Sequence, residues 1–403
     1  MRILNVTQSY APFFEFGGPA VKVRALAEGL AARGHQVSVL TADWGLQRRL
    51  IERPAEPRAT PGPFGGKIDS NGVTTTYLPN WFHYRAISWN PALSRFLRAC
   101  LGGFDIVHIF GLYDLLGFRA AAECRKRGIP YVVEPIGMFV PIVRNLALKH
   151  VYHRLFGRKL FAGAAAIIAT ADQEKEELIA GGILKEKIVV RRNGVDVPAS
   201  LPPRGAFRFS LQIPEDAKLL LFLGRLSSKK SPDLLLRSFA DVINRQRLPR
   251  NQLHLAFVGP DEGGMLNSLQ STTAKLGLAG SVHFVPPLSG DSKWSAYRDA
   301  DVFVLPSQNE NFGNTAAESV AAGTPVILTD QCGIAPLLND IAGLAVPHNQ
   351  AQLAGAIESL LLDPSLYRKL QNGCATVVTS LDWNQPLNAM LDLYRTLASP
   401  SNS

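Results

Sequence analysis

The stretch VFVLPSQNENFGNTAAESVAAGTPVIL, residues 302–328, decides the fold. It begins with a short apolar run, Val302–Leu305, passes through a polar loop into a helix-length segment that ends before Gly323, and closes with a second apolar run, Pro325–Leu328. Two strand-length apolar runs on either side of one helix are typical of a βαβ unit, whose parallel strands are buried on both faces. The stretch therefore predicts a parallel sheet covered by helices.

The same alternation of apolar runs and amphipathic segments extends along the chain and predicts an α/β protein with two parallel sheets. The first half contains strand-like runs at Ile3–Val6, Val37–Leu40, Thr74–Tyr77, Ile106–Ile109, Tyr131–Glu134, Ala166–Ala169 and Ile188–Val190. The second half contains them at Leu219–Leu223, Leu255–Val258, Val282–Val285, Val302–Leu305, Pro325–Leu328 and Leu344–Val346.

The domain boundary is expected where this periodic pattern is interrupted. Asn193–Asp196 leads into a proline-rich stretch with few periodic apolar residues, as expected of an inter-domain connection. We predict an N-terminal domain at 1–196, a linker at 197–214, a C-terminal domain at 215–380 and a last helix at 381–403.

Composition and length describe a globular chain. With 403 residues, 46% of them apolar and 19% charged, it is long enough to bury a sizeable core in two or three domains. Residues 52–72 are rich in proline and glycine and should form a surface loop, and Ser399–Ser403 should be disordered.

The sequence predicts a cytoplasmic protein. Ile3–Val6 already forms a strand, and no apolar run approaches the roughly 20 residues that span a bilayer, so we expect neither a signal peptide nor a transmembrane helix. The cysteines form no C-x-x-C pair and should be buried thiols in a reducing compartment. They are Cys100, Cys124, Cys332 and Cys374.

The net charge of +9 is unevenly distributed. Residues 1–196 contain 26 Lys and Arg against 16 Asp and Glu, whereas residues 197–403 contain 16 against 17. A basic surface can hold nucleic acid or an anionic membrane, or it can simply be solvated. The basic and apolar segment Arg144–Lys159 is either an amphipathic helix that docks peripherally on the inner face of a membrane, or a helix packed on its own sheet.

Two glycine-containing loops follow predicted strands in positions that suit an anionic ligand. In open parallel sheets, ligands bind at the carboxyl ends of strands, where helix N-termini offer N–H groups. After the first strand, Gly17 and Gly18 let the backbone approach a phosphate, and the same pair also suits a tight turn without a ligand. In the second domain, Gly224 permits a turn, and Arg225 and Lys230 bring two positive charges that either bind a diphosphate or remain solvated.

Two carboxylates are placed to reach the same strand end. Glu310 lies in the loop after Val302–Leu305, and Glu318 lies in the following helix, whose N-terminus Gly313 opens. Ionised carboxylates accept hydrogen bonds from ribose or sugar hydroxyls without a metal. Taken singly, each glutamate is equally an ordinary surface or helix-start acid.

Together these residues resemble the E-x7-E motif of the retaining glycosyltransferases of family four, and the similarity extends over nearly the whole chain. The resemblance implies the GT-B fold, in which two Rossmann-like, doubly wound domains face each other across a cleft. It makes 1–196 the acceptor-binding domain and 215–380 the nucleotide-sugar-binding domain, with the helix at 381–403 crossing back to the first domain. It assigns Glu310 to the donor sugar and Glu318 to the nucleotide ribose. It assigns Arg225 and Lys230 to the diphosphate.

The resemblance also implies backbone contacts to the donor. Gly17 and Gly18 match the phosphate-facing loop of the family, and Asn193–Asp196 matches its inter-domain crossover. The other donor contacts are expected at Gly224, Val285, Phe312, Gly313, Asn314 and Thr315. Two departures stand out: Pro286-Pro287 occupies a place where glycine is common, which leaves the base open, and Ser231 occupies the usual glycine position after the phosphate-loop lysine, with little effect expected.

The acceptor side departs further from the family. Many members carry a histidine after the strand that matches Tyr131–Glu134, but Ile136 occupies that position here, so the contact of that histidine to the sugar is missing or replaced. Acceptor contacts are assigned to His108, Glu134 and Met138. His108 is equally a core or capping histidine.

No metal site is expected. Asp299-Ala300-Asp301 spells D-x-D, a metal-binding pattern in another transferase fold. Here it ends a helix just before a buried strand, so Asp301 should not reach a ligand.

The expected reaction is hexosyl transfer from a UDP- or GDP-sugar to a glycan or lipid-linked acceptor, in cell-surface polysaccharide or lipopolysaccharide synthesis. In retaining members the departing phosphate accepts the proton of the acceptor, so no protein nucleophile and no metal cofactor is required. Two alternatives stay open: a nucleotide-sugar epimerase or hydrolase on the same fold, and a binding protein that has lost catalysis. Nucleic acid is not an expected partner, because no module for it is recognisable.

Overall fold

The computed structural model describes residues 1–403 except 15–17, 53–56, 85–86, 141–156, 248 and 400–403. The chain divides into two compact units. Unit 1 comprises residues 1–193 and 383–403, and unit 2 comprises residues 194–382. The first break falls inside the segment Asn193–Asp196, on which the domain boundary was predicted.

Unit 1 is built around a sheet whose nine strands, within the described residues, follow the order β11-β10-β9-β8-β1-β2-β5-β4-β3. From β11 to β5 all neighbours pair in parallel, whereas β4 pairs antiparallel with β3 and β5. A separate antiparallel pair is formed by β6 (Phe82–Tyr84) and β7 (Ile87–Trp89). The sheet strands are β1 (Arg2–Thr7), β2 (Gln36–Ala42), β3 (Thr60–Gly62), β4 (Gly65–Ser70), β5 (Val73–Leu78), β8 (Ile106–Phe110), β9 (Tyr131–Glu134), β10 (Ala166–Ala169) and β11 (Ile188–Val190).

The antiparallel edge of this sheet corrects one prediction. The sequence predicts a surface loop at 52–72, but β3 and β4 extend the sheet there. A Cβ atom on Gly65 would lie 2.1 Å from the carbonyl oxygen of Tyr77. The glycine therefore permits close backbone approach between β4 and β5, and it does not mark an irregular loop.

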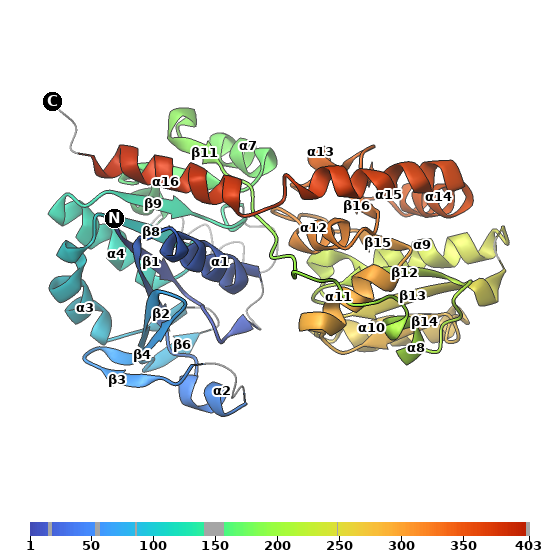
Figure 1. Ribbon diagram of the computed structural model, residues 1–403, viewed down its shortest axis with the longest axis horizontal. Helices are drawn as coiled ribbons and strands as arrows, with labels where there is room; N and C mark the ends of the chain where they lie inside the picture. The colour runs from blue at the N-terminus through green and yellow to red at the C-terminus, as the bar shows by residue number, and fades with distance from the viewer. Residues whose placement is uncertain (15–17, 53–56, 85–86, 141–156, 248, 400–403) are drawn as a thin grey trace. The chain divides into compact units, whose positions relative to one another are not determined.

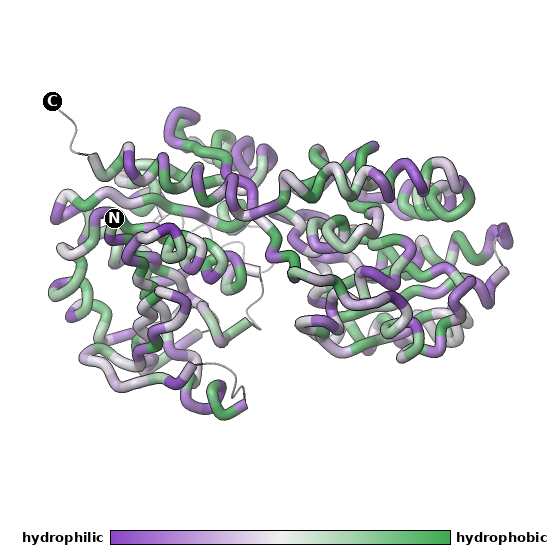
Figure 2. The backbone as a smooth tube through the Cα atoms, in the orientation of Figure 1, coloured by the Kyte–Doolittle hydropathy of each residue, from purple (hydrophilic) through white to green (hydrophobic). Residues whose placement is uncertain are grey.

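Helices cover both faces of the unit 1 sheet (Figure 1). One face packs against α1 and α16 through side chains such as Leu26, Met390 and Tyr394, and the other packs against α3, α4, α6 and α7. Hydrophilic and hydrophobic residues alternate along α16, as expected of a helix with one buried face (Figure 2). The helices are α1 (Gly18–Ala32), α2 (Leu46–Glu52), α3 (Ala92–Cys100), α4 (Leu115–Arg127), α6 (Arg158–Ala162), α7 (Asp172–Ala180) and α16 (Asn384–Ala398).

Unit 2 is built on an all-parallel sheet of strand order β14-β13-β12-β15-β16-β17. Its strands are β12 (Lys218–Leu223), β13 (Leu253–Val258), β14 (Val282–Val285), β15 (Val302–Leu305), β16 (Val326–Thr329) and β17 (Gly343–Val346). Its helices are α8 (Ala206–Ser210), α9 (Pro232–Asn244), α10 (Met265–Lys275), α11 (Gly290–Asp299), α12 (Asn314–Ala321), α13 (Ala335–Leu338), α14 (Gln350–Leu362) and α15 (Pro364–Val378).

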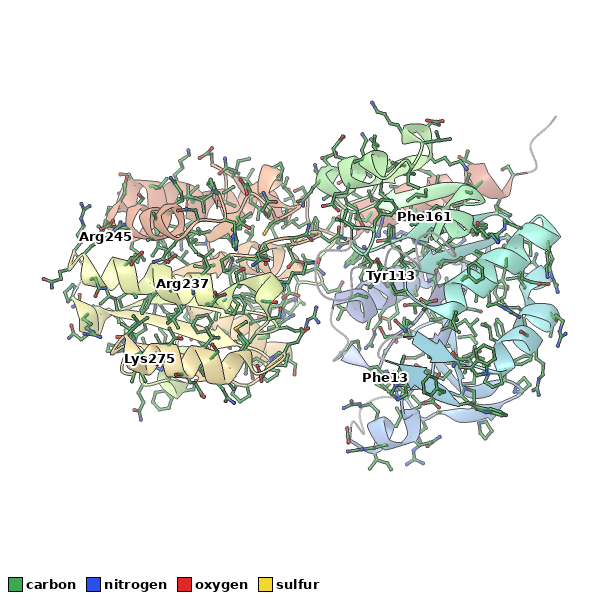
Figure 3. The ribbon with its side chains drawn as sticks, turned by 180° about the vertical axis from the view of Figure 1, so that it is seen from behind. Phe13, Tyr113, Phe161, Arg237, Arg245 and Lys275 are labelled. Atoms are coloured by element: carbon green, nitrogen blue, oxygen red, sulfur yellow. The ribbon has the colours of Figure 1, made fainter. Side chains whose placement is uncertain are left out.

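The helices of unit 2 bury one face each against this sheet. In α9, Leu235 and Phe239 are fully buried, while Arg237, and Arg245 directly after the helix, lie on the outer side (Figure 3). The predicted linker 197–214 contains α8, whose Phe207 packs into the core of unit 2. That part of the linker belongs to the domain core because an aromatic side chain there is removed from water.

The strands predicted from apolar runs are found in both sheets, which confirms the α/β fold class. All four cysteines are free thiols; three are buried, and Cys100 is half-buried, so the prediction of burial is wrong for that residue. None of the helices in the described residues is long and apolar enough to cross a bilayer. Most of the basic segment Arg144–Lys159 and of the tail Ser399–Ser403 lies outside the described residues.

Candidate functional site

The predicted donor residues of unit 2, except Val285, lie in the loops after β12 and β15 and on α12, where the strand order of the sheet reverses. The strand β12 pairs with β13 on one side and β15 on the other. The chain leaves β12 toward one edge and later returns to β15, so the loops after these two strands diverge at their carboxyl ends. Ligands of open α/β sheets bind at this topological switch point.

The loop after β12 carries the two predicted cations. The N–H group of Gly224 donates to the carbonyl of Val258 over 2.9 Å, and a Cβ on Gly259 would lie 1.9 Å from the oxygen of Gly224. Glycine is required at 259 because the loops after β12 and β13 are in backbone contact. Arg225 is half-exposed and pairs with Glu262 over 3.1 Å, which leaves its guanidinium accessible to an anion.

Lys230 and Glu310 form an ion pair, with 2.5 Å between Nζ and Oε2. Two backbone hydrogen bonds hold Glu310: its N–H donates to Gln331 over 2.9 Å, and its carbonyl accepts from Gly333 over 2.9 Å. Burial would raise the pKa of Glu310, but Lys230, with Lys229 and Arg225, brings it below the ordinary value. The structure thus places an ionised carboxylate and an ammonium group side by side at the switch point.

Ser231, at the position where glycine is usual in the family, has a backbone conformation that favours glycine. Its backbone has φ +48°, in the left-handed region that costs a non-glycine residue about 1–2 kcal/mol. Its hydroxyl donates to the carbonyl of Ser228 over 3.2 Å and lies 2.9 Å from Nε2 of His348. These contacts hold the serine in the conformation that glycine adopts more easily.

Glu318 lies on α12 and is held by two side chains that were not predicted as site residues. The hydroxyl of Tyr297 donates to its Oε2 over 2.8 Å, and Nζ of Lys293 lies 3.0 Å from its Oε1. Burial, together with the neighbouring Glu318, raises the pKa of Tyr297 well above its ordinary value, so the phenol stays a donor. No spacing in the sequence pairs α11 with α12, and their proximity follows only from the fold.

The start of α12 is suited to a ligand that has many hydrogen-bond acceptor atoms. Gly313, at φ +107°, opens the helix, and no side chain caps it. Phe312 is buried, whereas Asn314 and Thr315 occupy the first turn. The hydroxyl oxygen of Thr315 is buried without a hydrogen-bond partner among the described residues. A helix N-terminus and an unsatisfied hydroxyl both favour a bound anion or hydroxyl group.

The loop after β14 lies at the outer edge of the same sheet. The carbonyl of Val285 accepts from Gly259 over 3.1 Å, and both Pro286 and Pro287 are exposed. Since proline has no N–H group, this loop can offer a ligand carbonyl oxygens and apolar rings from these two positions.

The D-x-D residues have structural partners. The carboxylate of Asp299 accepts from the backbone N–H groups of Gly205, Phe207 and Arg208, which caps α8. Asp301 pairs with the guanidinium of Arg208 over 2.7 Å. Both carboxylates are occupied in holding α8 on the sheet.

The structure corrects the acceptor assignments of His108 and Glu134, which lie in the interior of unit 1 with no exposed surface. Glu134 forms ion pairs with Lys22 and with Arg191, whose Nη2 lies 2.7 Å from Oε2. His108 lies between Glu134 and Tyr394, with 2.6 Å from its Nδ1 to the tyrosine hydroxyl. These side chains form a buried polar cluster, so the core interpretation of His108 holds and neither residue presents an atom to an acceptor.

Lys22 and Arg191, the cationic members of this cluster, were not predicted from the sequence. A signal for Lys22 exists: it precedes Leu26 and Leu30 at intervals of four residues, on the face of α1 that is buried. A lysine on that face requires an anionic partner in the interior.

His108 should make stability depend on pH. Burial lowers its pKa to about 4 despite the contact with Glu134, so between pH 6.5 and 4 the unfolded chain binds a proton that the folded chain does not. Stability should therefore fall as the pH falls through this window, by up to about 3 kcal/mol from this group. Urea unfolding across the window should show a shallower slope for His108→Gln than for the wild type. The exposed His83→Gln serves as control, and an equal slope for His108→Gln would contradict the prediction.

The turn after β9 places Ile136 and Met138. Ile136 and Gly137 both adopt positive φ, at +55° and +65°, and the N–H of Met138 donates to the carbonyl of Pro135 over 3.2 Å. The carboxylate of Glu174 accepts from the N–H of Gly137 over 2.6 Å and stabilises the turn. Met138 is half-buried and remains the accessible member of the predicted acceptor set.

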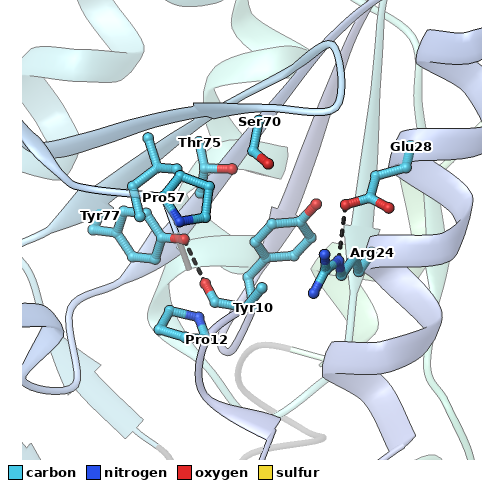
Figure 4. Close-up of a pocket in the computed structure, with 10 residues that line it drawn as sticks. Tyr10, Pro12, Arg24, Glu28, Pro57, Ser70, Thr75 and Tyr77 are labelled. Atoms are coloured by element: carbon cyan, nitrogen blue, oxygen red, sulfur yellow. Dashed lines mark hydrogen bonds and ion pairs between the residues drawn. The ribbon is translucent and has the colours of Figure 1, made fainter. Parts of the chain in front are cut away.

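The glycine pair of the first domain is described only in part. Gly18 is the first residue of α1, whereas Gly17 lies outside the described residues. Figure 4 shows a small pocket of unit 1 beside α1, lined by Tyr10, Thr75, Tyr77 and the ion pair Arg24–Glu28. None of the predicted site residues lines this pocket.

Comparisons with known proteins identify the family. The profile described as glycosyl transferases group 1 matches residues 203–375, and the glycosyl transferase 4-like domain matches residues 17–194. The D-inositol 3-phosphate glycosyltransferase of Streptomyces bingchenggensis is 34% identical over 308 residues, which cover 73% of this chain and 67% of that protein. Its counterpart from Kineococcus radiotolerans is 30% identical over 407 residues, covering 94% of this chain and 90% of that protein.

A solved structure shares the fold. The structure of Alr3699/HepE from Anabaena in complex with UDP and glucose matches with a TM-score of 0.77 at 18% identity, over 98% of this chain and all of that chain. An identity this low shows the fold alone. With relatives of at least 30% identity aligned along most of their length, the family predicted from the E-x7-E motif is confirmed: the chain is a GT-B glycosyltransferase that belongs to family four, the glycosyl transferases group 1.

Proposed function

We propose that this glycosyltransferase moves a sugar from a nucleoside diphosphate sugar, with retention of anomeric configuration, to a hydroxyl of a glycan or lipid-linked acceptor. The observation that supports this most is the Lys230–Glu310 ion pair at the switch point of unit 2, beside Arg225 and the uncapped start of α12. UDP is the first nucleotide to test, because the similar Anabaena structure contains it.

Four side chains of unit 2 bind different parts of the donor. Arg225 and Lys230 are cations that accommodate the two negative charges of the diphosphate. Glu318, held by Tyr297 and Lys293, presents a fixed carboxylate to the ribose hydroxyls. Glu310 has a lowered pKa and is ionised at neutral pH, so it accepts hydrogen bonds from sugar hydroxyls and does not act as a proton donor.

The proposed reaction needs no protein nucleophile. The bond between the anomeric carbon and the β-phosphate oxygen breaks, the acceptor oxygen bonds to the same face of that carbon, and the acceptor proton passes to the departing phosphate. Negative charge develops on this phosphate, where Lys230 and Arg225 stabilise it without reorganisation. The same cations supply the charge for which other transferases use a metal, so we infer that the reaction is independent of metal.

Two acceptor classes compete. We infer a glycan or lipid-linked acceptor in cell-surface polysaccharide or lipopolysaccharide synthesis, because the basic excess lies in the first half of the chain. The names of the relatives support a second candidate, a cyclitol phosphate such as inositol 3-phosphate. A phosphorylated cyclitol is small and anionic, and assays with both acceptor classes distinguish them.

Donor binding can be measured without knowing the acceptor. UDP- and GDP-sugars are added separately in the presence of EDTA. Donors of one of the two nucleotides should raise the thermal midpoint of unfolding of the protein, because a ligand that binds only the folded state stabilises it. Glu318→Gln should weaken the binding of this donor by about 10- to 100-fold, as expected for lost hydrogen bonds to a charged group. Isothermal titration with the free nucleotide gives the affinity.

An exposed carboxylate of unit 2 provides the control for this experiment. Glu215→Gln, an exposed carboxylate of unit 2, should bind the donor like the wild type. Stabilisation that disappears with EDTA would refute metal independence. Unchanged affinity of Glu318→Gln would remove this residue from the donor site, and no response to any nucleotide sugar would refute the proposed donor class.

A further inference from the structure

The hairpin β6–β7, together with Trp81 directly before it, carries large apolar side chains that are exposed. Of their surfaces, 79% is exposed for Trp81, 67% for Phe82 and 57% for Trp89. Phe82 and Trp89 are cross-strand partners and share one face of the hairpin, whereas Ser88, opposite His83, is buried on the other face. A group of large apolar side chains exposed close together usually marks an interaction surface.

The hairpin is attached to the loop that begins α2. The side-chain amide of Asn80 donates to the carbonyl of Asp43 over 2.7 Å, and the rings of Trp44 and His83 pack edge to face at 5.4 Å. The helix α2 contributes Ile51, which is 81% exposed, and Arg48, whose side chain is also largely exposed. Figure 1 shows α2 and β6 at the same end of unit 1. We call Ile51, Trp81, Phe82 and Trp89 the apolar tip.

The charge of unit 1 complements an anionic partner. Residues 1–193 and 383–403 contain 27 Lys and Arg against 16 Asp and Glu, a net charge of +11, whereas residues 194–382 contain 15 against 17, a net charge of −2. The apolar tip therefore stands on the one unit of the chain that attracts anionic surfaces over a distance.

We propose that the apolar tip inserts into the interface of an anionic lipid bilayer. Tryptophan prefers the level of the lipid headgroups, where its ring is partly apolar and its N–H group remains wet. Ile51 favours a bilayer over a polysaccharide, because an aliphatic side chain gains nothing from stacking on a sugar, whereas lipid chains bury it. This proposal rests on the lipid-linked acceptor proposed above, because docking would bring unit 1 to such an acceptor.

Vesicle binding tests the surface independently of catalysis. The full chain should co-sediment with phosphatidylcholine vesicles that contain phosphatidylglycerol, and high salt or omission of phosphatidylglycerol should weaken binding. Replacing Trp81, Phe82 and Trp89 together by serine should weaken binding by at least about tenfold. Wild-type tryptophan emission should shift to the blue on binding, and less so in Trp81→Phe or Trp89→Phe.

A matched control distinguishes insertion of the apolar tip from nonspecific adsorption of any exposed aromatic residue to the vesicles. Phe209 of α8 is 86% exposed and lies in unit 2, so Phe209→Ser should bind vesicles like the wild type. Thermal midpoint and donor affinity should be unchanged in the triple variant, so that failure of the donor assay and failure of docking are distinguished. Equal vesicle binding by the triple variant, absence of wild-type binding, or release of the wild type by a soluble glycan would each overturn the proposal.

Discussion

Replacing Lys230 by methionine should lower kcat for sugar transfer by about 100- to 1000-fold, on the scale of a lost transition-state donor. Methionine keeps the length of the side chain and removes the charge that, in the proposed reaction, stabilises the departing phosphate. The substitution also leaves Glu310, whose Oε2 lies 2.5 Å from Nζ, without its ion-pair partner. Initial rates with a saturating nucleotide sugar, or slow donor hydrolysis without an acceptor, measure the effect.

The pH–rate profile distinguishes an electrostatic role of Lys230 from a purely structural one. Lys230 brings the pKa of Glu310 below its ordinary value against the effect of burial, so this pKa should rise in the variant. The acidic limb of the pH–rate profile should then lie at higher pH for Lys230→Met than for the wild type. Lys275→Met, an exposed charge change on α10, should leave rate and profile unchanged (Figure 3). A variant with wild-type kcat would show that Lys230 is a solvated loop cation.

Glu134→Gln should lower the free energy of unfolding of unit 1 by about 3–5 kcal/mol, the usual cost of removing one partner from a buried ion pair. The change leaves Lys22 and Arg191 in the interior without a counter-charge. Burial already lowers the pKa of Lys22 to about 8, so this lysine can lose its proton and limit the damage. Calorimetry of the full chain should show the transition of unit 1 roughly 6–20 °C lower.

The depressed pKa of Glu134 fixes the direction of the pH effect in the wild type. Arg191 and Lys22 outweigh burial and hold the pKa of Glu134 below its ordinary value. Its stabilising contribution is therefore present above the pKa of the unfolded chain and is lost as the pH falls toward the folded-state value. Glu123→Gln, a surface pair partner on α4, should change stability by less than about 0.5 kcal/mol. An unchanged transition in both Glu134→Gln and Arg191→Met would show that water solvates the cluster.

The strands were predictable because parallel strands buried on both faces need continuous apolar runs. Runs such as Leu219–Leu223 and Val302–Leu305 lie in β12 and β15 for this reason. The edge strands β3 and β4 were not predictable, because most of their residues are half-exposed or exposed and include several glycines. Composition at 52–72 indicates a loop, and only pairing with β5 makes it part of the sheet.

The residues of the proposed donor site were predictable where they lie close together in the sequence. Glu310, Gly313 and Glu318 lie in one loop and helix after one strand, so their spacing alone places them at one strand end. Their partners were not predictable. Tyr297 and Lys293 reach Glu318 from another helix, and nothing in their local sequence distinguishes them from ordinary residues of an amphipathic segment.

The sequence by itself determined the α/β class, the parallel strands of both sheets and the residues of the E-x7-E motif, because hydrophobic periodicity and motif spacing are local properties of a chain. Only the tertiary structure decided that His108 and Glu134 belong to the core. Tyr394, 286 residues after His108, closes over the histidine, and Arg191, 57 residues after Glu134, neutralises the carboxylate. Whether an ionisable side chain meets water or a buried counter-charge depends on such distant partners, and their approach is set by packing rather than by any local pattern.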